Sequence, residues 1–400
     1  MSLLEYFAAE TAAAAATPVP DRLPEMLAAP TPEEAAAALA GRLAAQAALT
    51  DQEGGFPTEE FQWLGAAGLL TAPLSQALGG AGLLAPPQTL SMLRTLKHLG
   101  RGNLAVGRVY EGHLNALQLT QRFGQPAQVQ RWAADARQGR LFGVWNTEAQ
   151  DGVHLEPLPE GRFRLRGSKT FGSGAGHLTR PLITGALPDG GWQMFILPAD
   201  EQLPTLDASF WKPLGMRATA SFRVDLTGAE IGPQDLLGPP GAYYQQPWFS
   251  GGAIRFAAVQ LGAAEAVFDE TRRFLRDLGR LDDPYQKMRL GEMAMLVESG
   301  NLWLRGAADH ATRPAAEADV AATIAYANLM RTAIEEICLR TLQLAERCVG
   351  ARGLLRPEPF ERLHRDLTHY LRQPAPDAAV ADAGRFVLAH PTPAHSLWNA

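Results

Sequence analysis

The sequence predicts an α+β protein of three domains: a helical N-terminal domain, a middle β-sandwich or β-barrel domain, and a C-terminal four-helix bundle. Three changes in the residue pattern along the 400-residue chain support this prediction. Apolar residues at helical spacing fill residues 50–138, and short segments separated by Gly and Pro fill residues 139–240. Long helical patterns return over residues 241–400, and an Ala-rich extension, residues 1–49, precedes the three domains.

Residues typical of helix N-termini predict where the helices of the N-terminal part begin. Thr31 is a typical cap for a helix that begins at Pro32 and runs to about Leu49, since acidic residues fill its first turn. Phe56-Pro57 opens a second helix in the same manner. Three longer helical patterns follow at about 88–100, 104–123 and 126–138.

The middle part alternates short apolar segments with turns. Phe142–Trp145 and Phe163–Phe171 bracket a loop of Pro, Gly and acidic residues, and the second segment alternates as a half-buried strand does. Hydroxyl-bearing residues follow both segments, Thr147 after the first and Ser173 after the second. Small hydrogen-bonding groups at the ends of two neighbouring strands can reach the polar edge of a flat ring, and this is what a flavin requires of its protein.

The C-terminal part carries apolar stripes along long helices. In the first helix the stripe alternates spacings of three and four, through Ile254, Ala257, Leu261, Ala264, Phe268, Thr271, Leu275 and Leu278. Segments 288–308, 316–348 and 378–389 complete the predicted bundle. Cys338 and Cys348 lie in one of these helical patterns and are predicted to be buried thiols.

Composition excludes several classes of function. The formal net charge of −6 and the absence of a basic stripe argue against binding to nucleic acid or to an anionic membrane. No apolar run approaches the roughly 20 residues of a membrane span, and no signal peptide is evident, so a cytoplasmic location is expected. Pro181 soon follows the glycine run Gly172–Gly176, which argues against a dinucleotide-binding loop, and His364 and His369 lack the spacing of a metal site.

The order of short motifs resembles the acyl-CoA dehydrogenase family. The matching residues are Thr147-Glu148, Gly167–Ser173, Leu214–Arg217, Gly350–Gly353 and Arg365-Asp366. The resemblance spans roughly residues 50 to 390 and implies the same three-domain fold, FAD as the cofactor, and a homodimer or homotetramer.

The resemblance also implies roles for residues of the middle domain. Thr147 would bond the pyrimidine end of the flavin, and Ser173 would keep the hydroxyl that bonds N5. Phe171 stands where the family has a Trp beside the ring, so an aromatic face is retained. Trp145, at the end of the first strand, is counted with these three as a cofactor contact.

A second set of cofactor contacts is implied at the end of a bundle helix. Arg347, Gly350 and Ala351 fall where the family's Gln-x-x-Gly-Gly reaches the FAD of a neighbouring subunit. Arg347 departs from that Gln, and either contact with the pyrophosphate or a solvated charge is open for it.

The catalytic residue is unknown from the sequence. In most of the family a Glu eight residues after Arg-Asp removes the α-proton of an acyl thioester, but Pro374 stands there. Gly252 occupies the alternative position for this base, and His369 or Asp377 could serve instead. Asp377 is also well placed to begin the last helix.

The resulting hypothesis is a flavoprotein oxidoreductase that acts on a small molecule, with an acyl thioester as the default substrate and a separate electron acceptor. The alternatives are a flavin-dependent monooxygenase of the same fold, supplied by a flavin reductase, and a catalytically silent flavin-binding homologue.

Overall fold

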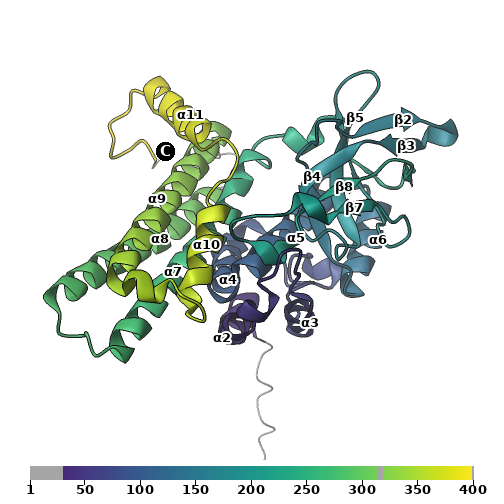
Figure 1. The fold of residues 1–400 in the computed structure, drawn as a ribbon. Coiled ribbons are helices and arrows are strands. Elements are labelled where there is room, and N and C mark those ends of the chain that lie inside the picture. The colour runs from purple at the N-terminus through teal and green to yellow at the C-terminus, as the bar shows by residue number, and fades with distance from the viewer. Residues whose placement is uncertain (1–29, 313–318, 399–400) are drawn as a thin grey trace, which may run out of the picture. The chain divides into compact units, whose positions relative to one another are not determined.

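The computed structural model describes residues 30–312 and 319–398, so residues 1–29 of the predicted extension lie outside it. The described chain has N-terminal helices, two β-sheets and C-terminal helices, which confirms the predicted fold class (Figure 1). None of the helices in the described ranges is long and apolar enough to cross a membrane.

The N-terminal helices begin where the start signals predict. They are α2 (Pro32–Thr50), α3 (Thr58–Ala66), α4 (Thr89–Gly102), α5 (Leu104–Phe123) and α6 (Pro126–Arg137). Thr31 caps α2, because its hydroxyl oxygen accepts from the Glu34 amide at 3.3 Å and the Glu34 carboxylate accepts from the Thr31 amide at 2.8 Å. Helix α2 then packs along α4 and joins the core of the helical domain.

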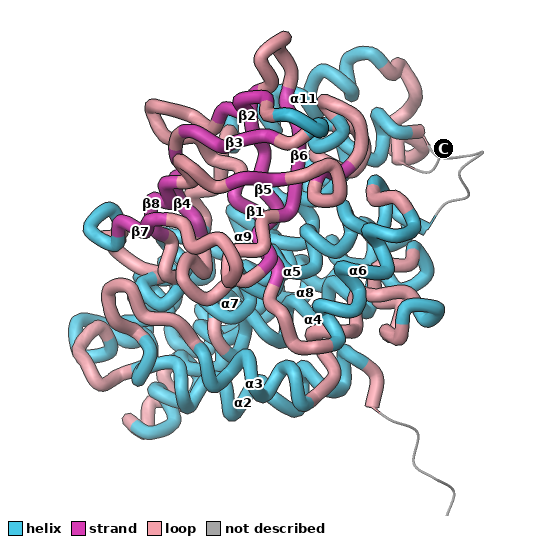
Figure 2. Tube along the Cα trace, turned by 90° about the vertical axis from the view of Figure 1, so that its right-hand side faces the viewer, coloured by secondary structure: helices cyan, strands magenta, loops and turns pink. Residues whose placement is uncertain are grey.

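The strands form two sheets. Their bounds are β1 (Phe142–Trp145), β2 (His154–Pro157), β3 (Phe163–Arg166), β4 (Ser168–Gly172), β5 (Arg180–Ala186), β6 (Trp192–Ile196), β7 (Thr205–Asp207), β8 (Phe222–Asp225), β9 (Glu230–Ile231) and β10 (Leu236–Leu237). The larger sheet has the order β10-β6-β5-β2-β3-β9, with β1 parallel to β5, and the smaller sheet has the order β4-β8-β7. Figure 2 shows the strands gathered above the N-terminal helices.

The predicted single strand Phe163–Phe171 is wrong, because the chain changes sheets at Gly167. This glycine has a φ of +103°, and a Cβ there would lie 1.6 Å from the carbonyl oxygen of Gly152. Strand β3 therefore pairs with β2 in the larger sheet, whereas β4 pairs with β8 in the smaller one. Alternation alone does not reveal such a break, since both halves keep the period of a strand.

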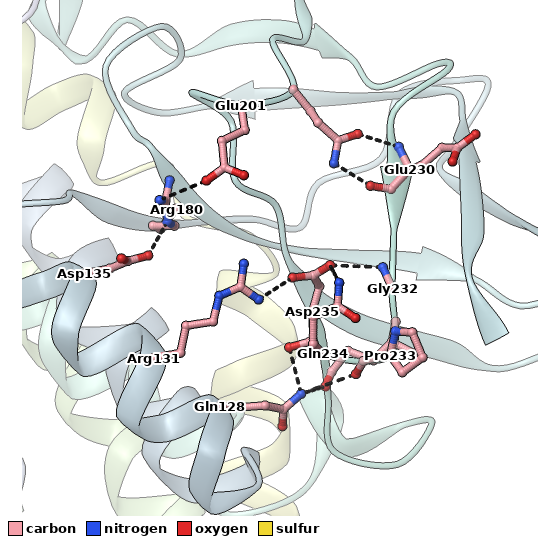
Figure 3. A network of polar contacts seen from close by, with 12 residues as sticks. Gln128, Arg131, Asp135, Arg180, Glu201, Glu230, Gly232, Pro233, Gln234 and Asp235 are labelled. Atoms are coloured by element: carbon pink, nitrogen blue, oxygen red, sulfur yellow. Dashed lines mark hydrogen bonds and ion pairs between the residues drawn. The ribbon is translucent and has the colours of Figure 1, made fainter. Parts of the chain in front are cut away.

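A polar network attaches α6 to the β domain (Figure 3). Gln128 donates through Nε2 to the carbonyl oxygen of Leu236 at 2.6 Å, and Arg131 pairs with the buried Asp235 at 2.9 Å. These contacts orient the helical domain against the loop before β10.

The C-terminal helices are α7 (Ala253–Asp277), α8 (Pro284–Thr312), α9 (Val320–Gly353), α10 (Pro359–Tyr370) and α11 (Pro376–Ala389). Residues 359–370, for which the sequence analysis predicts no helix, form α10. Helix α7 packs against α4, α8 and α9 at the centre of the described chain. Cys338 and Cys348 are buried and free, which confirms the prediction of buried thiols.

Helix α10 joins three parts of the chain through Arg365 and Asp366. Arg365 pairs with Asp51 at 2.5 Å and donates to the carbonyl oxygen of Leu214 at 3.4 Å. Asp366 accepts from the Met216 amide at 2.6 Å. Burial raises the pKa of Asp366 to about 6, although nearby arginine and the Met216 amide oppose that rise.

Candidate functional site

The four residues predicted to contact the flavin from the middle domain lie together. The indole Nε1 of Trp145 donates to the carbonyl oxygen of Ser173 at 3.0 Å, and the Thr170 amide donates to the carbonyl oxygen of Thr147 at 2.9 Å. Trp145 is buried and Ser173 is half-buried, whereas Thr147 and Phe171 are exposed. Although β1 and β4 belong to different sheets, the segments that follow them meet and present one polar and aromatic edge.

A buried ion pair holds Thr147 in place. Lys169 is fully buried and pairs with Glu148, and it also donates to the Asn146 carbonyl oxygen and the Thr184 hydroxyl, both at 3.2 Å. Burial lowers the pKa of Lys169, and the bond to Glu148 opposes this shift. Both neighbours of Thr147 are thereby anchored, so its side chain is held outward at the edge.

The Ser173 hydroxyl ends a chain of three hydroxyl groups. It shares a hydrogen bond of 2.8 Å with Ser221, which shares one of 2.7 Å with Thr219, and Thr219 donates to the Met216 carbonyl oxygen at 2.9 Å. A carbonyl can only accept and a hydroxyl has one proton. Each of the three hydroxyl groups therefore donates its hydrogen bond toward the Met216 carbonyl oxygen. No hydroxyl of this series donates to Ser173, so the Ser173 oxygen is left as an acceptor.

A small cavity of about 10 Å³ separates Ser173 from helix α5. Its walls are Arg108, Val109, Gly112, Gly143, Val144, Ser173 and Leu178. Arg108 is the charged residue among them, and it places a guanidinium group on the Ser173 side of α5.

Behind this cavity lies a buried polar cluster that the sequence analysis missed. Glu111 pairs with Arg108 at 3.0 Å and with Arg255 of α7 at 3.5 Å, and only 7% of Glu111 and 4% of Arg255 are exposed. Arg255 also donates to Gln118 at 2.6 Å and to Asn115 at 2.9 Å. The sequence does contain a pattern that indicates this cluster. Four polar residues recur at spacings of three and four on one face of α5, namely Arg108, Glu111, Asn115 and Gln118.

Tyr370 of α10 is electrostatically coupled to this cluster. Its side chain is buried, and its hydroxyl has no hydrogen-bond partner among the described residues. Burial raises the pKa of Tyr370, and the nearby Arg108 and Glu111 charges act on it in opposite directions. The group therefore stays protonated at neutral pH and is an unused donor in the interior.

The positions considered for a catalytic base hold no carboxylate that faces the site. His369, the other residue considered, is half-buried, its ring lies edge-on to that of Trp211 with 5.6 Å between the centroids, and burial lowers its pKa. Pro374 is exposed, and its carbonyl oxygen accepts from Arg331 at 2.9 Å. Asp377 is exposed in the first turn of α11, which confirms that it begins the last helix. Ala375 is left-handed rather than extended, contrary to the expectation for a residue before proline. A Cβ at Gly252 would lie 2.6 Å from the Arg255 guanidinium.

Arg347, Gly350 and Ala351 belong to the C-terminal end of α9 and are exposed. Figure 1 shows α9 on the bundle side of the chain and the strands on the other. Gly350 has a φ of +58°, and this interrupts the helix next to the exposed residues. Any contact of these three residues with a second subunit remains a prediction.

Comparison with known proteins adds a family match. The acyl-CoA dehydrogenase N-terminal domain model matches residues 31–140, and the acyl-CoA dehydrogenase C-terminal domain model matches residues 254–371. A dibenzothiophene monooxygenase of Mycolicibacterium goodii is 24% identical over 375 residues, which are 84% of this chain and 89% of the relative. A probable FMNH2-dependent monooxygenase of Pseudomonas putida is 27% identical over 410 residues, which are 92% and 98% of the two chains.

Two solved structures share the fold. The FMN-bound dibenzothiophene monooxygenase of Paenibacillus sp. A11-2 superposes with a TM-score of 0.80 at 21% identity, over 92% of this chain and 99% of the other. Butyryl-CoA dehydrogenase of Megasphaera elsdenii superposes with a TM-score of 0.78 at 18% identity, over 90% and 98%. The same architecture therefore accompanies both types of enzyme.

Proposed function

Because this chain belongs to the acyl-CoA dehydrogenase family, we propose that it is a flavin-dependent monooxygenase that oxygenates a small molecule. In this reaction reduced flavin supplies two electrons, one oxygen atom of O2 enters the substrate, and the other leaves as water. The relatives described above that are named as monooxygenases support this alternative over the initial hypothesis of acyl thioester oxidation.

The observation that carries the proposal is that neither of the family's two positions for the catalytic base holds a carboxylate. A dehydrogenase of this family needs a carboxylate to remove the α-proton, a group typically worth about 10²–10⁴ in rate. Pro374 and Gly252 occupy the two positions for it, and Asp377 is an exposed helix-start residue. Glu111, the acidic residue closest in sequence to the cavity wall, is held between Arg108 and Arg255 by two ion pairs.

The charges near Ser173 suit oxygen transfer better than proton abstraction. Arg108 would stabilise negative charge that develops beside the ring, and Glu111 would hold both Arg108 and Arg255 in place. Tyr370 carries a protonated hydroxyl without a partner in the described chain, so it is an unused hydrogen-bond donor beside the same cluster.

The hydroxyl chain supports a flavin that arrives reduced. Since the Ser173 hydroxyl donates its hydrogen bond to Ser221, the Ser173 oxygen is free to act as an acceptor toward the flavin. N5 of a reduced flavin carries a hydrogen to donate, whereas N5 of an oxidised flavin can only accept. The edge formed by Thr147, Phe171 and Ser173 thus fits the reduced ring, which a separate flavin reductase would deliver.

We propose FMN rather than the initially expected FAD as the flavin. The FMN-bound structural neighbour supports FMN, and residues Arg280–Pro284 keep little of the family's Arg-x-x-Phe-Gly contact to the FAD phosphates. If FAD is bound instead, Arg347, Gly350 and Ala351 are the residues to reach its pyrophosphate from a second subunit.

A homodimer or homotetramer remains part of the proposal. Exposed apolar residues recur along α8 at spacings of three and seven, which is the pattern of a helix face that packs against another helix. They are Tyr285, Met288, Met295 and Leu302.

Reconstitution with FMN, NADH and a flavin reductase under labelled oxygen tests the function. We expect one labelled oxygen atom in dibenzothiophene or indole, the compounds named with the related enzymes. Bleaching of the oxidised flavin by butyryl-CoA without a reductase would overturn the proposal in favour of a dehydrogenase. Binding of flavin without turnover of either compound or of butyryl-CoA would favour the catalytically silent flavin-binding homologue, and failure to bind either flavin would overturn the proposal.

A further inference from the structure

A second polar cleft lies where helices α2, α4 and α8 meet. It has a volume of about 230 Å³, and its lining residues are Glu33, Arg94, Lys97, His98, Asn301, Leu304 and Arg305. The predicted flavin contacts come from the β domain and from α9, so no residue of this cleft belongs to the site described above. Most of the lining is cationic or can donate hydrogen bonds.

The positively charged side chains of the cleft differ in how many ion pairs and hydrogen bonds they form. Lys97 is well bonded, to Glu265 at 2.7 Å and to Asn301 at 2.8 Å. Arg94 has only a long contact of 3.4 Å with Glu33 and is about one third exposed. Arg305 is exposed and has no acidic partner among the described residues. The lining therefore carries three positive charges, on Arg94, Lys97 and Arg305, and one carboxylate, Glu33, and the two arginines are the least satisfied of these cations.

His98 adds a neutral donor to the cleft. Burial, reinforced by the neighbouring Lys97 charge, lowers the pKa of His98, and the carboxylates of Glu265 and Glu33 only partly offset this. The imidazole is therefore neutral at pH 7 and still offers one N–H group.

We propose that this cleft binds a small phosphate-class anion. Arginine presents a planar fork of donors that matches phosphate oxygens, and Arg94 and Arg305 contribute two such forks from different helices. The volume lies below the roughly 300 Å³ at which pockets for drug-sized ligands begin. The lining holds no Phe, Tyr or Trp residue, so a nucleobase would find only the small imidazole ring of His98 on which to stack.

Binding would link the helical domain to the bundle. Arg94 belongs to α4 and Arg305 to α8, so one anion held by both would join the two helices. A ligand that binds only the folded chain raises its unfolding temperature. The structure thus predicts a phosphate-dependent gain in stability that does not depend on flavin.

Thermal unfolding of the full chain tests this inference. Saturating inorganic phosphate should raise Tm by roughly 2 °C or more over sodium chloride of the same ionic strength. Arg305→Ala and Arg94→Ala should each weaken the apparent affinity about tenfold, because a charge-assisted hydrogen bond is lost. Arg385→Ala, an exposed arginine of α11 paired within its own helix, is the matched control and should respond as the unaltered chain does.

The same unfolding assay with ribose 5-phosphate, and with ribose as its control, distinguishes free phosphate from a phosphorylated metabolite as the natural ligand. Tighter binding of ribose 5-phosphate than of inorganic phosphate, lost in Arg305→Ala, would indicate a phosphorylated metabolite. Equal binding would indicate free phosphate. No phosphate-specific shift, or an equal shift in Arg305→Ala and the unaltered chain, overturns the inference, because the anion then binds elsewhere or not at all.

Discussion

Replacing Ser221 by alanine should reverse the hydrogen-bonding role of Ser173. In the unaltered chain Ser221 accepts a hydrogen bond from the Ser173 hydroxyl at 2.8 Å and donates one to Thr219 at 2.7 Å. Ser221 is only 3% exposed and Thr219 only 1%, so bulk water has little access to the missing hydroxyl. In Ser221→Ala the Ser173 proton is free, and it should turn toward N5 of an oxidised flavin.

The expected magnitude follows from one exchanged hydrogen bond. A typical hydrogen bond contributes about 0.5–1.5 kcal/mol net, which corresponds to roughly a 2- to 13-fold change in a dissociation constant. The ratio of Kd for oxidised FMN to Kd for reduced FMN should therefore fall by about that factor. For a two-electron couple this is a shift of roughly 10–30 mV in the potential of the bound flavin.

Anaerobic fluorescence titration with oxidised and reduced FMN measures the ratio. When Ser173 is also replaced by alanine, Ser221→Ala should no longer change this ratio, because no hydroxyl group then faces N5. Thr170→Ala is a suitable control, because the Thr170 hydroxyl lies on the same strand but bonds the Glu148 carbonyl oxygen at 3.2 Å, outside the chain of hydroxyls. An unchanged ratio in Ser221→Ala would refute the proposed direction of the protons.

Three further outcomes are expected. Glu111→Gln should lower the free energy of unfolding by about 2–3 kcal/mol in urea denaturation, because a buried guanidinium loses its charge partner but keeps two neutral acceptors. Glu156→Gln, in an exposed ion pair, should cost less than about 1 kcal/mol. Asp377→Asn should leave oxygenation nearly unchanged, whereas loss of a true base would cost roughly 10²-fold or more. Burial raises the pKa of Asp366 to about 6 from 3.8, so the folded state holds this proton longer than the unfolded state does. The stability that protonated Asp366 contributes is therefore present below pH 3.8 and is lost as pH rises through 6. Over that window the free energy of unfolding of the unaltered chain, measured in urea, should fall by about 3 kcal/mol relative to that of Asp366→Asn.

The sequence by itself determined the order of the three parts and many of their elements, although not α10 or the break between β3 and β4. The Thr31 cap, the strand Phe142–Trp145 and the helix start at Pro376 all appear where local signals predict them. Such signals act between residues a few positions apart, so a single chain displays them directly. Thr147 and Ser173 were also singled out from the sequence, because hydroxyl groups that follow short apolar segments are visible without a fold, and their contact with a flavin stays a prediction.

Only the tertiary structure decided how these elements combine into sites. The Glu111–Arg255 pair joins residues 144 positions apart, and the Ser173–Ser221 bond joins residues 48 positions apart. Gly167 turns the chain into a second sheet, because a carbonyl oxygen occupies the place where a side chain would begin. Spacing along the chain specifies which face of a helix or strand is apolar, but the partner of that face is set by how distant elements pack.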